Sequence, residues 1–113
     1  MTVIDQAAFE ELRQTAGADF MPELIDTFLE DAPRMLEDLH RDLAVADAEA
    51  LRRTAHSFKS NANTFGALKL AELARDLEVI GREARLSDAP AKLAELSAEY
   101  DRVAVELKEL RNG

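Results

Sequence analysis

The residues of this sequence best suited to chemistry lie in one stretch, from Ala55 to Ala67, that contains His56. Polar residues recur there three and four positions apart, the spacing that places side chains on one face of a helix. This polar strip consists of His56, Lys59, Ser60 and Asn63, and Arg52 and Arg53 continue it one turn earlier. A second set at helical spacing is apolar and predicts the face that packs into a core, namely Ala55, Phe58, Ala62 and Phe65. We therefore expect His56 in the middle of a helix, turned outward beside the core stripe.

This strip is suited to phosphorus chemistry. A neutral imidazole nitrogen such as that of His56 attacks phosphorus and forms a P–N bond that stays reactive. Lys59, almost one turn further on, could neutralise phosphate charge. Small side chains at Ser60 and Asn63 would leave room for a phosphoryl group and for a partner's active site. No Asp or Glu occurs from Ala50 to Ala71, so we expect no carboxylate beside the imidazole, where its charge would repel an incoming phosphate.

The same residues allow a plainer interpretation. A single outward-facing histidine on a helix is most often a solvated surface residue, and so are neighbouring Arg and Lys residues. We expect this of His40, the second histidine. Glu37 and His40 have the Glu-x-x-His spacing of metal sites inside helical bundles, but the sequence has no second copy of that motif. We therefore predict no metal site in this chain.

The composition narrows the classes of function. A chain of 113 residues fits a single domain, here residues 1–113. The absence of cysteine excludes disulfide bonds and thiolate metal sites. A net charge of −9 disfavours nucleic acid as a partner, because phosphate binding needs a basic face. The sequence has neither an apolar run long enough for a bilayer nor the features of a secretory signal, so we expect no membrane partner and a location in the cytoplasm.

Five stretches show the apolar period of an α-helix. They are residues 4–15, residues 24–46, the stretch between Asp47 and Gly66, residues 70–84 and residues 93–110. Asp19 and Asp47 are predicted to cap helix N-termini, and Gly66 to end its helix. The second stretch contains Pro33 but keeps its phase on both sides, so we expect a kink near Glu30 in preference to a break.

These elements predict the fold. No stretch alternates with a period of two residues, so no β-strand is expected. Long amphipathic helices with short connections pack as an antiparallel bundle. The sequence therefore predicts an all-α, antiparallel up-down four-helix bundle, with the short first helix as a cap at one end.

The stretch around His56 resembles the signature of the histidine-containing phosphotransfer (HPt) domains of two-component phosphorelays. The shared pattern is an Ala-His pair, an apolar residue, a lysine, small residues and a closing glycine, here from Ala55 to Gly66. The flanking stretches also resemble these domains, from about Leu24 to Leu86. The sequence departs from the family at Ser60, where glycine is frequent and would leave more room beside His56.

The resemblance implies a role for each residue of the site. His56 would accept a phosphoryl group through Nε2, Lys59 would balance its charge, and Gly66 would be structural. The other strip residues would bind the phosphoryl group or the partner, and the Ser60 hydroxyl could hydrogen-bond the imidazole or the phosphoryl oxygens. These other residues are Arg52, Arg53, Ser60 and Asn63.

The resemblance also implies the partners. HPt domains take the phosphoryl group from an aspartate of a receiver domain and pass it to another receiver aspartate, in a hybrid histidine kinase or a response regulator. The chain would therefore be a phosphotransfer intermediate without kinase activity, and the sequence has no Gly-rich nucleotide loop. We expect it to bind no cofactor, with Mg²⁺ supplied by the partner receiver, and to be a monomer. Docking would use the second helix beside His56, where Asp26, Thr27 and Glu30 are candidate neighbours, although a solvated role is the plainer interpretation of each.

Two other interpretations remain open. A non-catalytic adaptor of the same fold would bind a receiver or kinase without being phosphorylated, although the presence of both His56 and Lys59 argues against it. A fragment of a chemotaxis-type kinase is the other, although a chain that starts at Met1 and ends at Gly113 fits a free-standing protein better.

Overall fold

The computed structural model describes residues 2–112, so the ends of the expected domain, Met1 and Gly113, lie outside the described residues. The described chain is helical and contains no strand. Its elements are α1 (Gln6–Ala16), the 3₁₀ turn η1 (Ala18–Phe20), α2 (Met21–Ala44), α3 (Ala48–Thr64), α4 (Leu68–Arg82), the 3₁₀ turn η2 (Leu86–Asp88) and α5 (Ala89–Asn112). None of the described helices is both long and apolar enough to cross a membrane.

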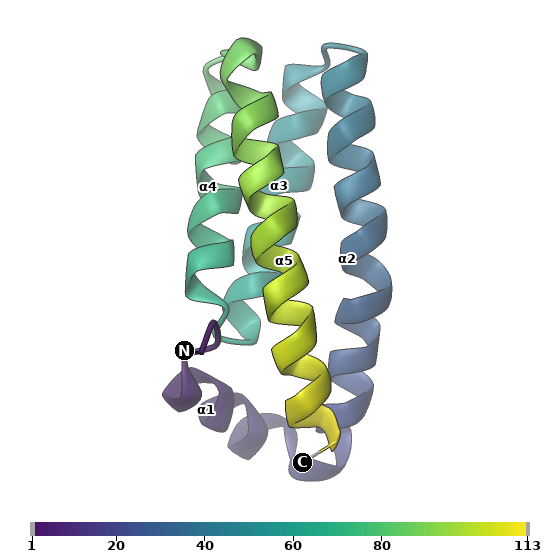
Figure 1. The fold of residues 1–113 in the computed structure, drawn as a ribbon, viewed down its shortest axis with the longest axis vertical. Helices are drawn as coiled ribbons and strands as arrows, with labels where there is room; N and C mark the ends of the chain where they lie inside the picture. Colours follow the sequence, from purple (N-terminus) through teal and green to yellow (C-terminus); the bar gives the residue numbers. More distant parts are fainter. Residues whose placement is uncertain (1, 113) are drawn as a thin grey trace.

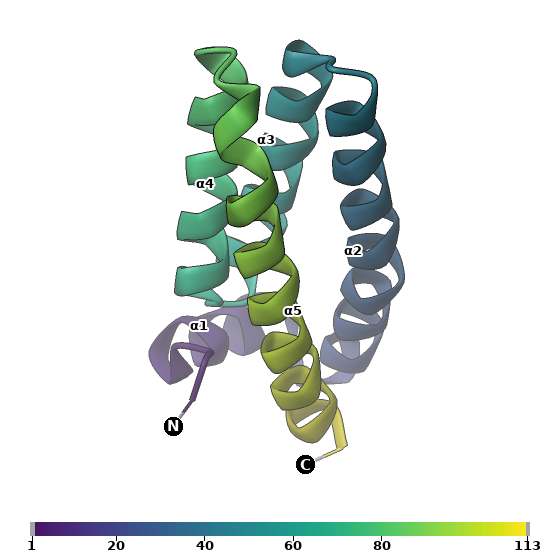
Figure 2. The ribbon, with the colours of Figure 1, turned by 45° about the horizontal axis from the view of Figure 1, so that its top comes forward.

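Helices α2 to α5 run side by side and alternate in direction, while α1 lies across one end of the bundle (Figures 1 and 2). The predicted all-α, up-down four-helix bundle with a capping helix is therefore confirmed. The core stripe predicted on α3 is buried, with Ala55, Phe58 and Ala62 fully enclosed. At the centre, the ring of Phe28 from α2 lies 6.4 Å from that of Phe58 and 6.0 Å from that of Tyr100 on α5. These aromatic contacts pack α3, the helix that carries the polar strip, against α2 and α5.

The ends of the helices agree only in part with the predicted caps. Asp47 caps α3, because its Oδ1 accepts a hydrogen bond from the backbone N–H of Ala50 at 3.0 Å. The predicted cap at Asp19 is wrong: the N-cap of α2 is Phe20, and no side chain caps that helix. Asp19 lies inside η1, which runs directly into α2, so it lacks the extended backbone that a capping residue needs.

Pro33 lies within α2, which runs without interruption from Met21 to Ala44. The proline therefore does not break the helix, as expected. The side chain of Pro33 is exposed. The prolyl ring therefore costs the helix one hydrogen bond without entering the core.

Two glycines permit close approaches that hold the site helix in place. Gly66, with φ of +77°, follows the end of α3 and accepts a hydrogen bond at 2.8 Å from the backbone N–H of Asp5. A Cβ there would lie 2.9 Å from the Cβ of Ala8, which side chains do not tolerate. In α4, a Cβ on Gly81 would lie 2.9 Å from the backbone N of Arg52. Gly81 therefore lets α4 pack directly against α3, and this contact brings side chains of α4 to the site.

Candidate functional site

The polar strip faces outward from α3, as predicted. His56 lies in the middle of the helix, and its side chain is 55% exposed. Arg53, Ser60 and Asn63 are also exposed, whereas Arg52 and Lys59 are half-buried. The helical period places the strip next to the buried stripe, so the imidazole lies at the boundary between core and solvent.

A carboxylate lies beside this imidazole. Nδ1 of His56 is 2.9 Å from Oε2 of Glu78, a residue of α4 that is only 5% exposed. The expectation that no carboxylate lies next to His56 is therefore wrong. The acid-free stretch describes neighbours along the chain, whereas Glu78 is 22 positions away and arrives through the antiparallel packing of α4 on α3.

Glu78 also holds two cations. Its Oε1 accepts a hydrogen bond from Nζ of Lys59 at 2.7 Å, and its Oε2 lies 3.7 Å from Nη2 of Arg82. Burial tends to raise the pKa of Glu78, but the hydrogen bonds from Lys59 and His56 outweigh burial and hold the pKa below its ordinary value. Glu78 is therefore an ionised acceptor at neutral pH.

The charge of Glu78 determines the state of the His56 ring. A carboxylate can only accept a hydrogen bond, so Nδ1 of His56 is the donor and carries the proton. In the neutral ring, Nε2 then keeps its lone pair. The ring is 55% exposed and Glu78 occupies its Nδ1, so Nε2 is the ring nitrogen with a lone pair left to react.

The remaining strip residues are less closely tied to His56. The hydroxyl of Ser60 donates to the backbone carbonyl of His56 at 3.2 Å, so in the described structure it does not bond the imidazole, one of its two candidate partners. Nε of Arg52 pairs with Glu49 at 3.0 Å, one turn earlier on the same helix. Asn63 and Lys59 line a shallow depression of about 200 Å³ between α3 and α4. The structure thus gathers His56 and Lys59 around Glu78 and leaves the other strip residues at the rim.

Sequence reasoning missed Glu78 and Arg82. A signal for Glu78 exists in the sequence, since small residues recur at helical spacing on α4 at Ala71, Ala74 and Gly81. Glu78 shares that buried face. An acidic residue on the same helical face as small buried residues is itself buried, so its carboxylate needs a partner on the facing helix.

The candidate neighbours on α2 lie elsewhere. Thr54 on α3 donates a hydrogen bond to Asp42 at 3.1 Å, a contact that places His56 near the level of residue 40 on α2. Asp26, Thr27 and Glu30 are displaced towards the far end of that helix, about 21 Å away for Asp26 at 1.5 Å per residue. Asp26 pairs instead with Nε of Arg111 on α5 at 2.6 Å. These three candidate neighbours therefore do not adjoin His56. His40 is exposed, as expected of a surface residue.

Known proteins resemble this chain along most of its length. Residues 23–106 match the family model described as Hpt domain. The phosphorelay protein LuxU of Vibrio harveyi is 28% identical over 96 residues, which cover 85% of this chain and 84% of LuxU. The crystal structure of histidine-containing phosphotransfer protein B (HptB) from Pseudomonas aeruginosa PAO1 superposes with a TM-score of 0.92 at 36% identity, over 96% of this chain and 94% of that one.

Proposed function

This chain belongs to the Hpt domain family, and from that premise we propose that His56 is the residue that carries the phosphoryl group. The family predicted from the sequence is confirmed, and the match covers residues 23–106. The chain is a phosphotransfer intermediate of a phosphorelay, and its partners are receiver domains. The identity of the acceptor residue and the roles of its neighbours form the proposal.

The observation that carries the proposal is the hydrogen bond between Nδ1 of the exposed His56 ring and the ionised carboxylate of Glu78. With Nδ1 protonated, the lone pair of Nε2 attacks the phosphorus of a receiver aspartyl phosphate. A P–N bond forms, the P–O bond to aspartate breaks, and the aspartate leaves as a carboxylate. The ring becomes positively charged during attack, and the Glu78 carboxylate stabilises that charge.

Lys59 balances charge in both states of the site. Before transfer, its Nζ neutralises Glu78 at 2.7 Å. After transfer, the flexible lysine stem lets the same ammonium group turn towards the phosphoryl oxygens. Arg82 is a further cation on the Glu78 side of the ring, and it keeps the carboxylate partnered when Lys59 moves.

The other members of the strip serve the approach of the receiver. Ser60 and Asn63 supply small exposed side chains next to the ring, which leave space for the receiver's active site. Arg53 adds positive charge one turn before His56, beside Arg52, whose charge Glu49 balances until a partner docks. Both arginines would meet the acidic residues that hold the receiver's Mg²⁺. In this proposal the receiver supplies the Mg²⁺, and the chain has no kinase activity of its own. The monomeric state and the location in the cytoplasm remain predictions.

Label transfer tests the acceptor. The full chain is incubated with a radiolabelled phosphorylated receiver and Mg²⁺, beside the variant His56→Gln. The wild type should acquire acid-labile, base-stable label and the variant none. Label on the variant would show that another residue accepts the group. If neither form accepts label from several receivers that it binds, the adaptor interpretation replaces this one.

A further inference from the structure

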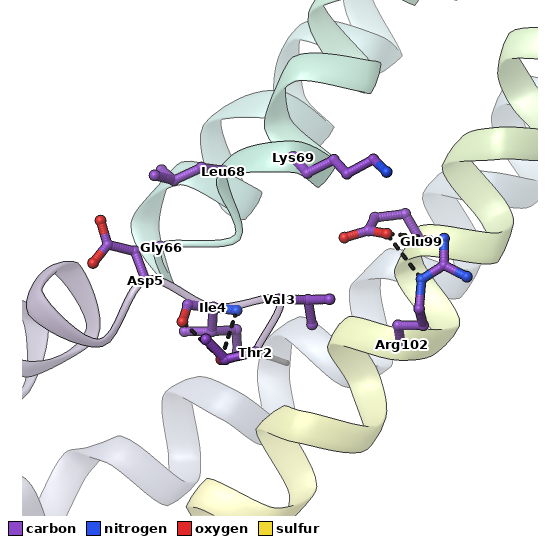
Figure 3. Close-up of a pocket in the computed structure, with 9 residues that line it drawn as sticks. All are labelled: Thr2, Val3, Ile4, Asp5, Gly66, Leu68, Lys69, Glu99 and Arg102. Atoms are coloured by element: carbon purple, nitrogen blue, oxygen red, sulfur yellow. Dashed lines mark hydrogen bonds and ion pairs between the residues drawn. The ribbon is translucent and has the colours of Figure 1, made fainter.

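A second cleft lies at the end of the bundle that α1 covers, away from His56. It opens where the segment before α1 passes between the α3–α4 turn and α5, and its volume is about 450 Å³ (Figure 3). Its walls are largely aliphatic and include Val3, Ile4 and Leu68. Gly66, which borders the cleft, is ten residues from His56, or about 15 Å along α3. The cleft is therefore separate from the phosphotransfer site.

One polar side chain enters this cleft from the core. Glu99 of α5 is 1% exposed, and its Oε1 accepts a hydrogen bond from Nε of Arg102 at 3.0 Å. Nη2 of Arg102 also lies 3.0 Å from the same oxygen, as an ion pair. Its Oε2 is buried and has no hydrogen-bond partner, and among residues 2–112 it is the only buried side-chain nitrogen or oxygen in that state. Figure 3 shows the carboxylate extending towards the cleft, below Lys69. A buried acceptor without a donor is costly, so this oxygen indicates a missing partner.

We propose that the cleft binds a primary ammonium group carried on a short aliphatic stem. The ammonium group donates a charge-assisted hydrogen bond to Oε2 of Glu99, and the stem packs against Val3 and Leu68. Arg102 repels a second cation only weakly, because its side chain is 58% exposed and water screens its charge. Lys69 lies at the rim, and no ion pair joins it to Glu99 in the described structure. An anionic ligand would instead face the carboxylate.

The ammonium group could belong to a free amine or to a lysine side chain of a partner protein, since both have the same chemistry. The test is a ¹H–¹⁵N NMR titration of the full chain with n-butylammonium chloride. We expect saturable shifts at the amides of Val3, Ile4, Gly66 and Leu68. A parallel titration with lysine capped at both backbone ends separates the sources. Comparable binding of the capped lysine assigns the cleft to a protein lysine, and binding of butylammonium alone assigns it to a small amine.

Two variants, Glu99→Gln and Lys69→Met, and the uncharged analogue 1-butanol decide the outcome. Glu99→Gln keeps the shape of the side chain and should weaken butylammonium binding about tenfold, because it removes the charged acceptor. Lys69→Met removes the nearest competing cation and should leave binding equal or tighter. Equal shifts with 1-butanol would mean mere apolar partition and would overturn the proposal. Binding that appears only in Lys69→Met would overturn it too, because Lys69 would then be the natural partner of Glu99.

Discussion

Removing the charge of Glu78 should slow phosphotransfer to His56. The variant Glu78→Gln keeps the size of the side chain but replaces the ionised acceptor, whose Oε2 lies 2.9 Å from Nδ1. A hydrogen bond to a charged group contributes about 1.5–3 kcal/mol. The ring is 55% exposed, so water screens part of this interaction and the lower end of the range applies, about 1.5 kcal/mol. Since about 1.4 kcal/mol corresponds to a tenfold change in rate constant, we expect transfer to be about tenfold slower.

The assay is single-turnover transfer of label from a phosphorylated receiver, with receiver in excess over a range of concentrations. The saturating rate constant should fall, while the receiver concentration at half saturation stays the same. In parallel, ¹⁵N NMR of the His56 ring should show Nδ1 protonated in the wild type and a mixture of tautomers in the variant. A purely structural role for Glu78 would leave the ring tautomer unmoved in the folded variant.

A matched control is Glu72→Gln. Glu72 is an exposed acidic residue of the same helix, and it makes no ion pair with His56 or Lys59 in the described structure. Its removal should leave the saturating rate constant within about twofold, since it changes only a screened surface charge. If Glu78→Gln transfers at the wild-type rate, or if Glu72→Gln is equally slow, the reasoning from the Nδ1 hydrogen bond is refuted.

Three further predictions concern stability, measured by urea denaturation. Gly66→Ala should lower the free energy of unfolding by about 2 kcal/mol, through positive φ and the contact with Ala8. Gly17 also has a positive φ, +94°, but its Cβ would be 3.9 Å from its nearest neighbour, so Gly17→Ala should show the backbone strain without the steric contact and lose less stability. Equal losses would show that the contact with Ala8 contributes nothing. Lys59→Met should lower the free energy of unfolding by about 1–2 kcal/mol, because it removes the hydrogen bond that Lys59 donates to buried Glu78. The same loss in the Glu78→Gln background would point to another cause. The pKa of Glu78 is lowered in the folded chain from an ordinary value of 4.5, so its stabilising contribution is present above pH 4.5 and is lost as the pH falls towards the lowered pKa. The wild type should therefore lose more stability than Glu78→Gln over this acid range, and parallel profiles would exclude the effect.

The helices and the outward position of His56 could be predicted from the sequence because they depend on local periodicity. The spacing of Ala55, Phe58 and Ala62 determines which face of α3 is buried, and the opposite strip must then meet solvent. The cap at Asp47 is local in the same way, since its side chain bonds a backbone N–H three residues away. Asp19 failed as a cap because a 3₁₀ turn can lead into a helix without any capping side chain, and residue type alone does not distinguish the two.

The partner of the imidazole was decided by tertiary structure alone. A helical period shows which way a side chain points, but not which helix lies opposite or in what register. Here the close contact at Gly81 sets α4 against α3 and brings Glu78 to His56 and Lys59. The register between α2 and α3 likewise places Asp26 far from His56, where it pairs with Arg111. The sequence by itself thus predicted the candidate acceptor His56 and determined its outward position on the helix, because both depend on local spacing. The carboxylate beside its ring depends on packing between two helices, and only the tertiary structure could decide it.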